Sequence, residues 1–148
     1  MVDGFEIGTD GPGRILVGID GSDTSLRAAA YAAGLARRQG AELIGLFVAD
    51  TTGIAANTVA TAGPMAVVHE ELGTELEQLL VEATHRLGIS ARLLRGSGSP
   101  HAELVRVADE LRVDAIVVGA SMQAGHRLVG SLAGRLVRDA RWPVTVVP

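Results

Sequence analysis

The sequence contains no cysteine, which excludes disulfides, thiolate metal sites and cysteine catalysis and is compatible with a reducing cytoplasm. Aromatic residues make up only 3% of the chain, and no basic cluster with interleaved aromatics occurs. Both observations argue against a nucleic-acid-binding protein, as does the net charge of −4.

Long hydrophobic runs are also missing. No apolar stretch approaches the roughly 20 residues that a membrane helix needs. The first residues, MVDGFEIGTDGPGR, carry acidic side chains and no apolar core of a secretory signal. We therefore expect a cytoplasmic protein with no nucleic-acid partner and no membrane segment.

What is present is a high content of hydrophobic residues, 47% of 148. A chain of this length and composition suits one domain with a substantial core. The first residues are polar and rich in glycine. We predict a flexible N-terminal tail over residues 1–13 and a single domain over residues 14–148.

Short apolar runs alternate with segments of helical character. The predicted strands are residues 14–20, 42–50, 89–95, 114–119 and 143–147. The predicted helices are residues 23–39, residues 66–87, the segment after Ser99 and residues 131–140. Continuous apolar runs are typical of strands covered on both faces. The alternation predicts an α/β fold: an open five-stranded parallel sheet with helices on both faces, Rossmann-like.

Local signals support several of these boundaries. Ser22 suits an N-cap, Gly40 and Gly88 suit helix ends, and Ser99 followed by Pro100 suits a helix start. Residues 51–64 show little periodicity and are expected to form a long, mobile connection. Ligands of open parallel sheets bind at the carboxyl ends of the strands. The loops after Ile19, Val48 and Val118 are therefore the candidate binding region.

Three stretches together resemble the universal stress protein family: RILVGIDGSDTSLRAAAYAA, GSGSPHAELVRVADELRVDAIVVGA and GSLAGRLVRDARWPVTVVP. The resemblance extends from about Arg14 to Pro148. It implies the adenine nucleotide alpha hydrolase-like version of the Rossmann-like fold, frequent homodimers, and roles in stress or regulation. It also implies that the ligand, where there is one, is ATP or another adenine nucleotide, with Mg as its companion.

ATP-binding members carry a loop of glycine, two residues, glycine, nine residues, then glycine followed by serine or threonine. Gly119, Gly130 and Ser131 match its first and last positions, where backbone N–H groups and a helix start approach phosphates. Met122 replaces the second glycine, and only seven residues follow it before Gly130. Gly125, His126 and Arg127 are candidates to compensate, since an arginine can supply a planar phosphate contact. The alternative is that this loop only connects a strand to a helix.

Three further residues are candidate contacts by the same resemblance. Asp20 would contact the ribose or adenine side, or else serve only as a turn residue before the helix. Val48 would line the adenine, or else belong to the core. Gly98 would offer a backbone contact, or else form a turn before Ser99.

No catalytic or metal-binding residues are predicted. The four histidines do not form a metal-ligand pattern, and no G-x-S-x-G elbow occurs. His101 is expected to be solvated, and His126 is the one histidine in the glycine loop. A slow ATPase is the weakest of three hypotheses, because the sequence offers no convincing base to position a water.

The leading hypothesis is a regulatory domain that senses an adenine nucleotide. The alternative is a stress-associated dimeric interaction protein that has lost nucleotide binding. Either would assemble as a homodimer through the last strand, Val144–Val147, which is uncharged and lies at a sheet edge in the family's strand order. Trp142 is expected to pack nearby or to lie at the margin of that interface.

Overall fold

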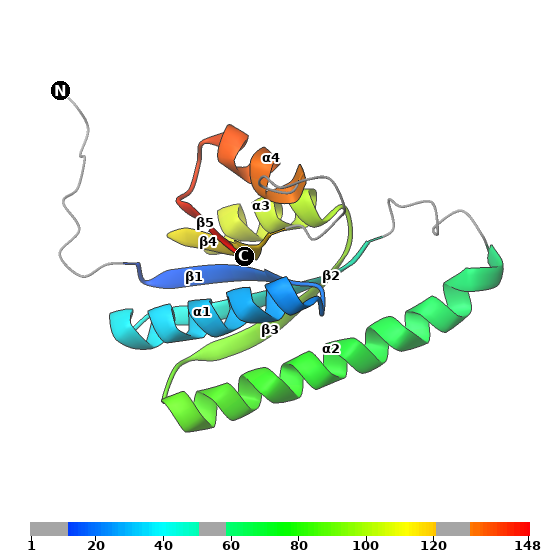
Figure 1. Cartoon of the computed structure of the whole chain (residues 1–148), viewed down its shortest axis with the longest axis horizontal. Coiled ribbons are helices and arrows are strands. Elements are labelled where there is room, and N and C mark those ends of the chain that lie inside the picture. The colour runs from blue at the N-terminus through cyan, green and yellow to red at the C-terminus, as the bar shows by residue number, and fades with distance from the viewer. Residues whose placement is uncertain (1–11, 51–58, 121–130) are drawn as a thin grey trace.

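The structure is a computed structural model that describes residues 12–50, 59–120 and 131–148, with the backbone alone for residues 59–65 and 131. Within these residues strands and helices alternate along the chain (Figure 1). The strands are β1 (Arg14–Ile19), β2 (Glu42–Asp50), β3 (Ala91–Gly98), β4 (Ala115–Gly119) and β5 (Val144–Val147). The helices are α1 (Asp23–Gln39), α2 (Val59–Leu87), α3 (Pro100–Leu111) and α4 (Ser131–Asp139).

All five strands of the sheet are parallel, in the order β3-β2-β1-β4-β5. The chain moves outward from β1 through β2 to β3, and then crosses over to β4 and β5 on the other side of β1. The strand order therefore reverses between β1 and β4. The predicted fold class is confirmed, and so is the edge position predicted for the last strand, β5; β3 forms the other edge.

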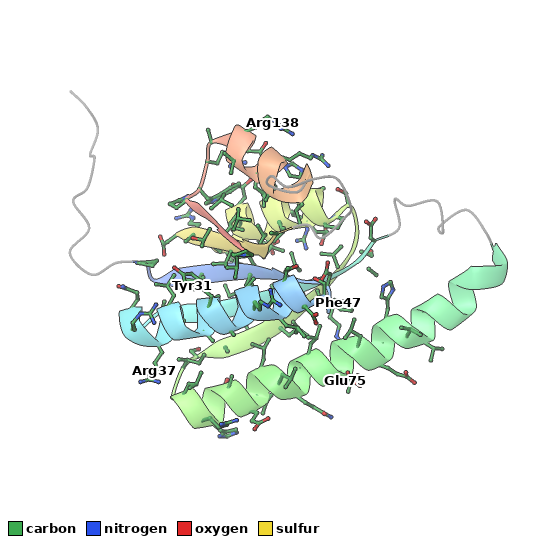
Figure 2. The ribbon with its side chains drawn as sticks, viewed as in Figure 1. Tyr31, Arg37, Phe47, Glu75 and Arg138 are labelled. Atoms are coloured by element: carbon green, nitrogen blue, oxygen red, sulfur yellow. The ribbon has the colours of Figure 1, made fainter. Side chains whose placement is uncertain are left out.

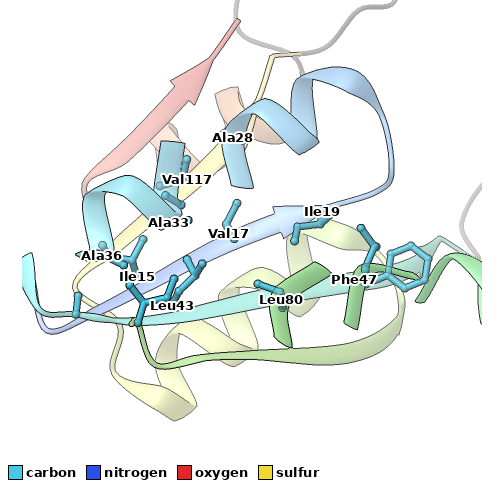
Figure 3. Packing of buried hydrophobic residues seen from close by; sticks show 14 residues of the cluster. Ile15, Val17, Ile19, Ala28, Ala33, Ala36, Leu43, Phe47, Leu80 and Val117 are labelled. Atoms are coloured by element: carbon cyan, nitrogen blue, oxygen red, sulfur yellow. The ribbon is translucent and has the colours of Figure 1, made fainter. Parts of the chain in front are cut away.

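Helices cover both faces of the sheet, which explains the continuous apolar runs. Ile15 and Val17 pack with Ala28 and other residues beneath α1 and α2 (Figure 3). Leu16 of the same strand packs with Leu104 and its neighbours beneath α3 and α4. Successive strand residues point to opposite faces, so a strand buried on both sides needs an apolar residue at nearly every position.

Helix α1 has the expected bounds and the expected caps. The Ser22 hydroxyl accepts a hydrogen bond from the Ser25 N–H, and Gly40 ends the helix with a positive φ of 65°. The small side chains of Ala28, Ala32 and Ala36 are fully buried. Exposed side chains such as Arg37 of α1, Glu75 of α2 and Arg138 of α4 lie on the outer sides of their helices (Figure 2).

Helix α2 begins earlier than the sequence predicted. It starts at Val59, so the expected connection is wrong for residues 59–64, while residues 51–58 lie outside the described part of the chain. The prediction failed because hydrophobic periodicity starts only near Val68, and Gly63 and Pro64 are poor helix formers. The described residues contain no helix that is long and apolar enough to span a bilayer.

Strand β3 is displaced toward the carboxyl end of the sheet relative to the predicted residues 89–95. It continues through Gly96 to Gly98 because this stretch pairs with Val48 to Asp50 of β2. Glycine has low strand propensity, so the pairing with a neighbouring strand, and not local preference, sets this boundary.

At the amino-terminal end of the sheet, the Gly13 and Arg14 N–H groups both donate to the Asp114 carboxylate at 2.9 Å. Most of the predicted tail, residues 1–11, lies outside the described residues.

Candidate functional site

The carboxyl ends of β1 and β4 meet where the strand order reverses. Asp20 follows β1 directly, and Gly119 is the last residue of β4. In an open parallel sheet the chains that leave two such strands turn toward opposite faces, which opens a crevice between them. The two residues come from distant parts of the sequence and are brought together only by the pairing of β1 with β4.

Asp20 is held in a network of hydrogen bonds with the first turn of α1. Its Oδ1 accepts from the Ser22 N–H at 2.8 Å, and its own N–H donates to the Ser25 hydroxyl at 3.2 Å. The Ser25 hydroxyl in turn donates to the Ser22 carbonyl at 3.0 Å. The turn is therefore built around the aspartate, which fixes the carboxylate at the helix N-terminus.

The carboxyl group of Asp20 stays ionised to lower pH than an ordinary aspartate. Partial burial by itself would raise the pKa of Asp20, but the hydrogen bonds from Ser22 and Ser25 and the backbone outweigh it and lower the pKa below 3.8. An ionised carboxylate accepts hydrogen bonds and donates none. The site thus presents an acceptor suited to hydroxyl groups.

Gly119 has a close neighbour that the sequence did not reveal. A β-carbon at this position would lie 2.5 Å from the Thr24 carbonyl carbon and 2.7 Å from the Ser25 nitrogen. The end of β4 therefore lies so close to the backbone of the first turn of α1 that only glycine fits at position 119. Gly119 has a packing role in the fold, whatever contact it makes with a ligand.

Val48 lies near the carboxyl end of β2 on the face covered by α3 and α4. It is partly buried and packs against the cluster of that face. Its register partner on β3 is Gly96. Val48 is thus accessible enough to line a ligand and apolar enough to serve as core, so both interpretations made from the sequence remain open.

Gly98 ends β3 with a φ of +103°, a conformation that residues with a β-carbon rarely adopt. The next residue, Ser99, is the N-cap of α3, with its hydroxyl accepting from the Ala102 N–H. Among the described residues, no heavy atom other than those of Gly98 and its chain neighbours lies within 4 Å of the position of a Gly98 β-carbon. The turn interpretation of Gly98 therefore has a geometric basis, and a ligand contact stays a prediction.

The remaining candidates belong to the glycine loop. Gly125, Arg127 and Gly130 lie outside the described residues, as do Met122 and His126. Ser131 is the first residue of α4. The structure places the start of α4 directly after this loop, and the roles predicted for the loop residues stay predictions.

Sequence reasoning missed two residues near the site. Ser25 supports Asp20, and the spacing of Ser22 and Ser25 behind the strand was the available signal. The carboxylate of Glu103 in α3 lies over Gly96 of β3. The position of Glu103 follows from the packing of α3 on β3, and no local pattern in the sequence indicated it.

His101 was expected to be solvated, and this is wrong. Its side chain is only 17% exposed, and its Nε2 lies 2.7 Å from Oδ2 of Asp139 at the end of α4. The contact joins helices far apart in the sequence, so it could not be inferred from His101 alone. Trp142 is partly buried against the hydrophobic cluster beneath α3 and α4, and the Arg141 guanidinium lies 4.5 Å from the centroid of its ring. No group of three or more potential metal ligands occurs in the described ranges.

The sequence model of the universal stress protein family matches residues 12–148. The chain belongs to the universal stress protein family. A universal stress protein of Methanocaldococcus jannaschii is 30% identical over 139 residues, which cover 90% of this chain and 81% of the relative. The resemblance noted in the sequence is therefore confirmed.

Solved structures of the family have the same fold. UspA from Lactobacillus plantarum superposes with a TM-score of 0.76 at 25% identity, covering 91% of this chain and 97% of that one. A universal stress protein solved in complex with cAMP superposes with a TM-score of 0.62 at 27% identity, covering 92% of this chain and 96% of that one.

Proposed function

We propose that this universal stress protein is a cytoplasmic regulatory domain that binds ATP or another adenine nucleotide at the carboxyl ends of β1, β2 and β4. The observation that supports it most is the Asp20 carboxylate, fixed by Ser22 and Ser25 at the reversal of strand order. A universal stress protein of similar fold has been solved with cAMP, a ligand of the same chemical class.

Each part of the nucleotide has a counterpart in the site. The ribose hydroxyls donate to Asp20, and the adenine lies against Val48. The phosphates lie at Gly119 and at the Gly130–Ser131 start of α4, where N–H groups and the helix dipole favour an anion. Gly125 and Arg127 supply the contacts that Met122 removes, Gly98 offers a backbone contact, and Mg accompanies the phosphates. The proposal includes no hydrolysis.

The second candidate is a stress-associated dimeric interaction protein without nucleotide, and the geometry of β5 supports the homodimer that both candidates require. The carbonyls of Pro143 and Val147 accept from Ile116 and Ala120 on the β4 side. Backbone groups of successive strand residues point to alternate sides. The N–H and C=O groups of Val144 and Val146 therefore point toward the open edge, where pairing with β5 of a second copy would satisfy them.

Native mass spectrometry of the purified protein separates the two candidates. The leading proposal expects a homodimer with a mass increment of an adenine nucleotide, retained from the cell or taken up from added ATP. A homodimer that takes up none of the added nucleotides supports the second candidate. A monomer would contradict the assembly expected by both.

A further inference from the structure

Glu103 occupies a space that Gly96 leaves free. A β-carbon at Gly96 would overlap the Glu103 Oε2 atom, so the carboxylate lies directly over the β3 backbone. Gly96 lies on the α3 side of the sheet, two positions after Leu94, which packs into the cluster of that side. The missing side chain on β3 is thus replaced by a carboxylate from α3.

This carboxylate lies beside Val48. Gly96 and Val48 are register partners on neighbouring strands, and both face α3 and α4. Paired strands are about 4.8 Å apart, which is less than the width of a purine base. A planar group that packs on Val48 is therefore wide enough to extend toward Gly96 and to bring its edge up to the Glu103 carboxylate, which covers that glycine.

Glu103 is ionised and held in place. Hydrogen bonds from Arg106, at 3.1 Å to Oε1 and 3.0 Å to Oε2, lower the pKa of the Glu103 carboxyl group, although burial acts in the other direction. The Glu103 side chain is 18% exposed, whereas the Arg106 side chain is 55% exposed. A carboxylate oxygen has two lone pairs, so each retains an acceptor position after pairing with Arg106.

We propose that Glu103 selects the base of the bound nucleotide, accepting a hydrogen bond from the exocyclic amine of adenine. A purine with an oxygen at the same position, such as hypoxanthine or guanine, presents an acceptor to the carboxylate and is rejected. The inference rests on the proposed function, because it requires the base to lie against Val48. An acceptor that is left opposite another acceptor makes no hydrogen bond, and this loss discriminates effectively between two ligands.

The test compares ATP with inosine triphosphate, which differs only in the base. Calorimetric titrations of the wild type should show ATP binding tighter by about tenfold or more, the value of a hydrogen bond to a charged group. Glu103→Gln, whose amide both donates and accepts, should reduce the ratio to about threefold or less. Arg106→Gln is the matched control: it removes the ion pair that holds the carboxylate but keeps the carboxylate itself, and it should reduce the preference for ATP less than Glu103→Gln does.

A second variant guards against loss of folding in Glu103→Gln. Gly96→Ala displaces the carboxylate without removing its charge, and should also weaken the preference for ATP. An unchanged ratio in both Glu103→Gln and Gly96→Ala would overturn the inference while leaving nucleotide binding intact. Equal loss of the preference in Arg106→Gln would assign the effect to the ion pair instead. A wild type that binds neither nucleotide would overturn the proposed function, and this inference with it.

Discussion

Gly119 at the end of β4 and Thr24 in the first turn of α1 approach so closely that a β-carbon on Gly119 would lie 2.5 Å from the Thr24 carbonyl carbon. The contact is between two backbones, so neither partner can move aside by changing a rotamer. It fixes the distance between the end of β4 and the helix start that holds Asp20. The same glycine thus links the stability of the domain to the shape of the candidate site.

Gly119→Ala should therefore lower the free energy of unfolding by about 1–3 kcal/mol, the usual cost of overpacking a close contact. Urea unfolding followed by circular dichroism measures this. Gly34→Ala is the control: it lies within α1, its β-carbon would lie 3.5 Å from the flexible Arg38 side chain, and alanine should stabilise the helix by about 0.5–1 kcal/mol. Equal stability of Gly119→Ala and the wild type would show that the close approach is not tight.

The hydrogen bonds of Asp20 predict a pH-dependent contribution to stability. Because the pKa of Asp20 is lowered on folding, its contribution is complete above the ordinary value of 3.8 and is lost as the pH falls through the folded-state pKa. Asp20→Asn should thus be less stable than the wild type near neutral pH, and the difference should shrink in acid. Urea titrations over a pH series test this. A difference that stays constant into strong acid would exclude the carboxylate as its source.

The open edge of β5 predicts which backbone group holds a homodimer together. Val146→Pro removes an N–H group that points away from β4 and should yield a monomer. Val146→Ala keeps that N–H group and, although it loses packing against α3 and α4, should remain dimeric. Light scattering at several protein concentrations distinguishes these outcomes. A dimeric Val146→Pro variant would place the interface elsewhere.

Two substitutions in the glycine loop compare the contribution of the Arg127 charge to ATP affinity with that of backbone freedom at Met122. If Arg127 supplies a phosphate contact, Arg127→Ala should weaken ATP binding by about 1.5–3 kcal/mol, the value of a charge-assisted hydrogen bond. Met122→Gly restores the glycine of the family motif and should leave affinity unchanged or improved. Fluorescence competition with an ATP analogue measures both. Arg127→Ala with wild-type affinity would remove the arginine from the site.

The sequence predicted those elements whose signals are local. The alanine-rich helix between Ser22 and Gly40 and the apolar run of β2 were located correctly, because a cap, a terminal glycine or a continuous apolar run marks each boundary. The start of α2 was missed because its first turns carry no apolar stripe. The end of β3 was missed because pairing with β2, and not propensity, extends it to Gly98.

The candidate site was predictable only in part for the same reason. Asp20 and Gly119 were predicted as site residues from motifs within single segments. The support of Asp20 by Ser25, the contact of Gly119 with Thr24 and the position of Glu103 over Gly96 all depend on how elements pack in three dimensions. A motif indicates which residues belong to a site, whereas packing decides which of them also have a structural role.

Titration calorimetry of the purified protein with ATP, ADP, AMP and cAMP tests the central claim most directly. Nucleotide should first be removed by unfolding and refolding, so that an occupied site is not mistaken for an inactive one. The account predicts saturable heat with at least one of these ligands, and weaker binding to Asp20→Asn, which lacks the carboxylate that accepts from the ribose. Absence of heat and of any thermal shift at about millimolar ligand, where binding free energies fall to about 4 kcal/mol, would contradict it.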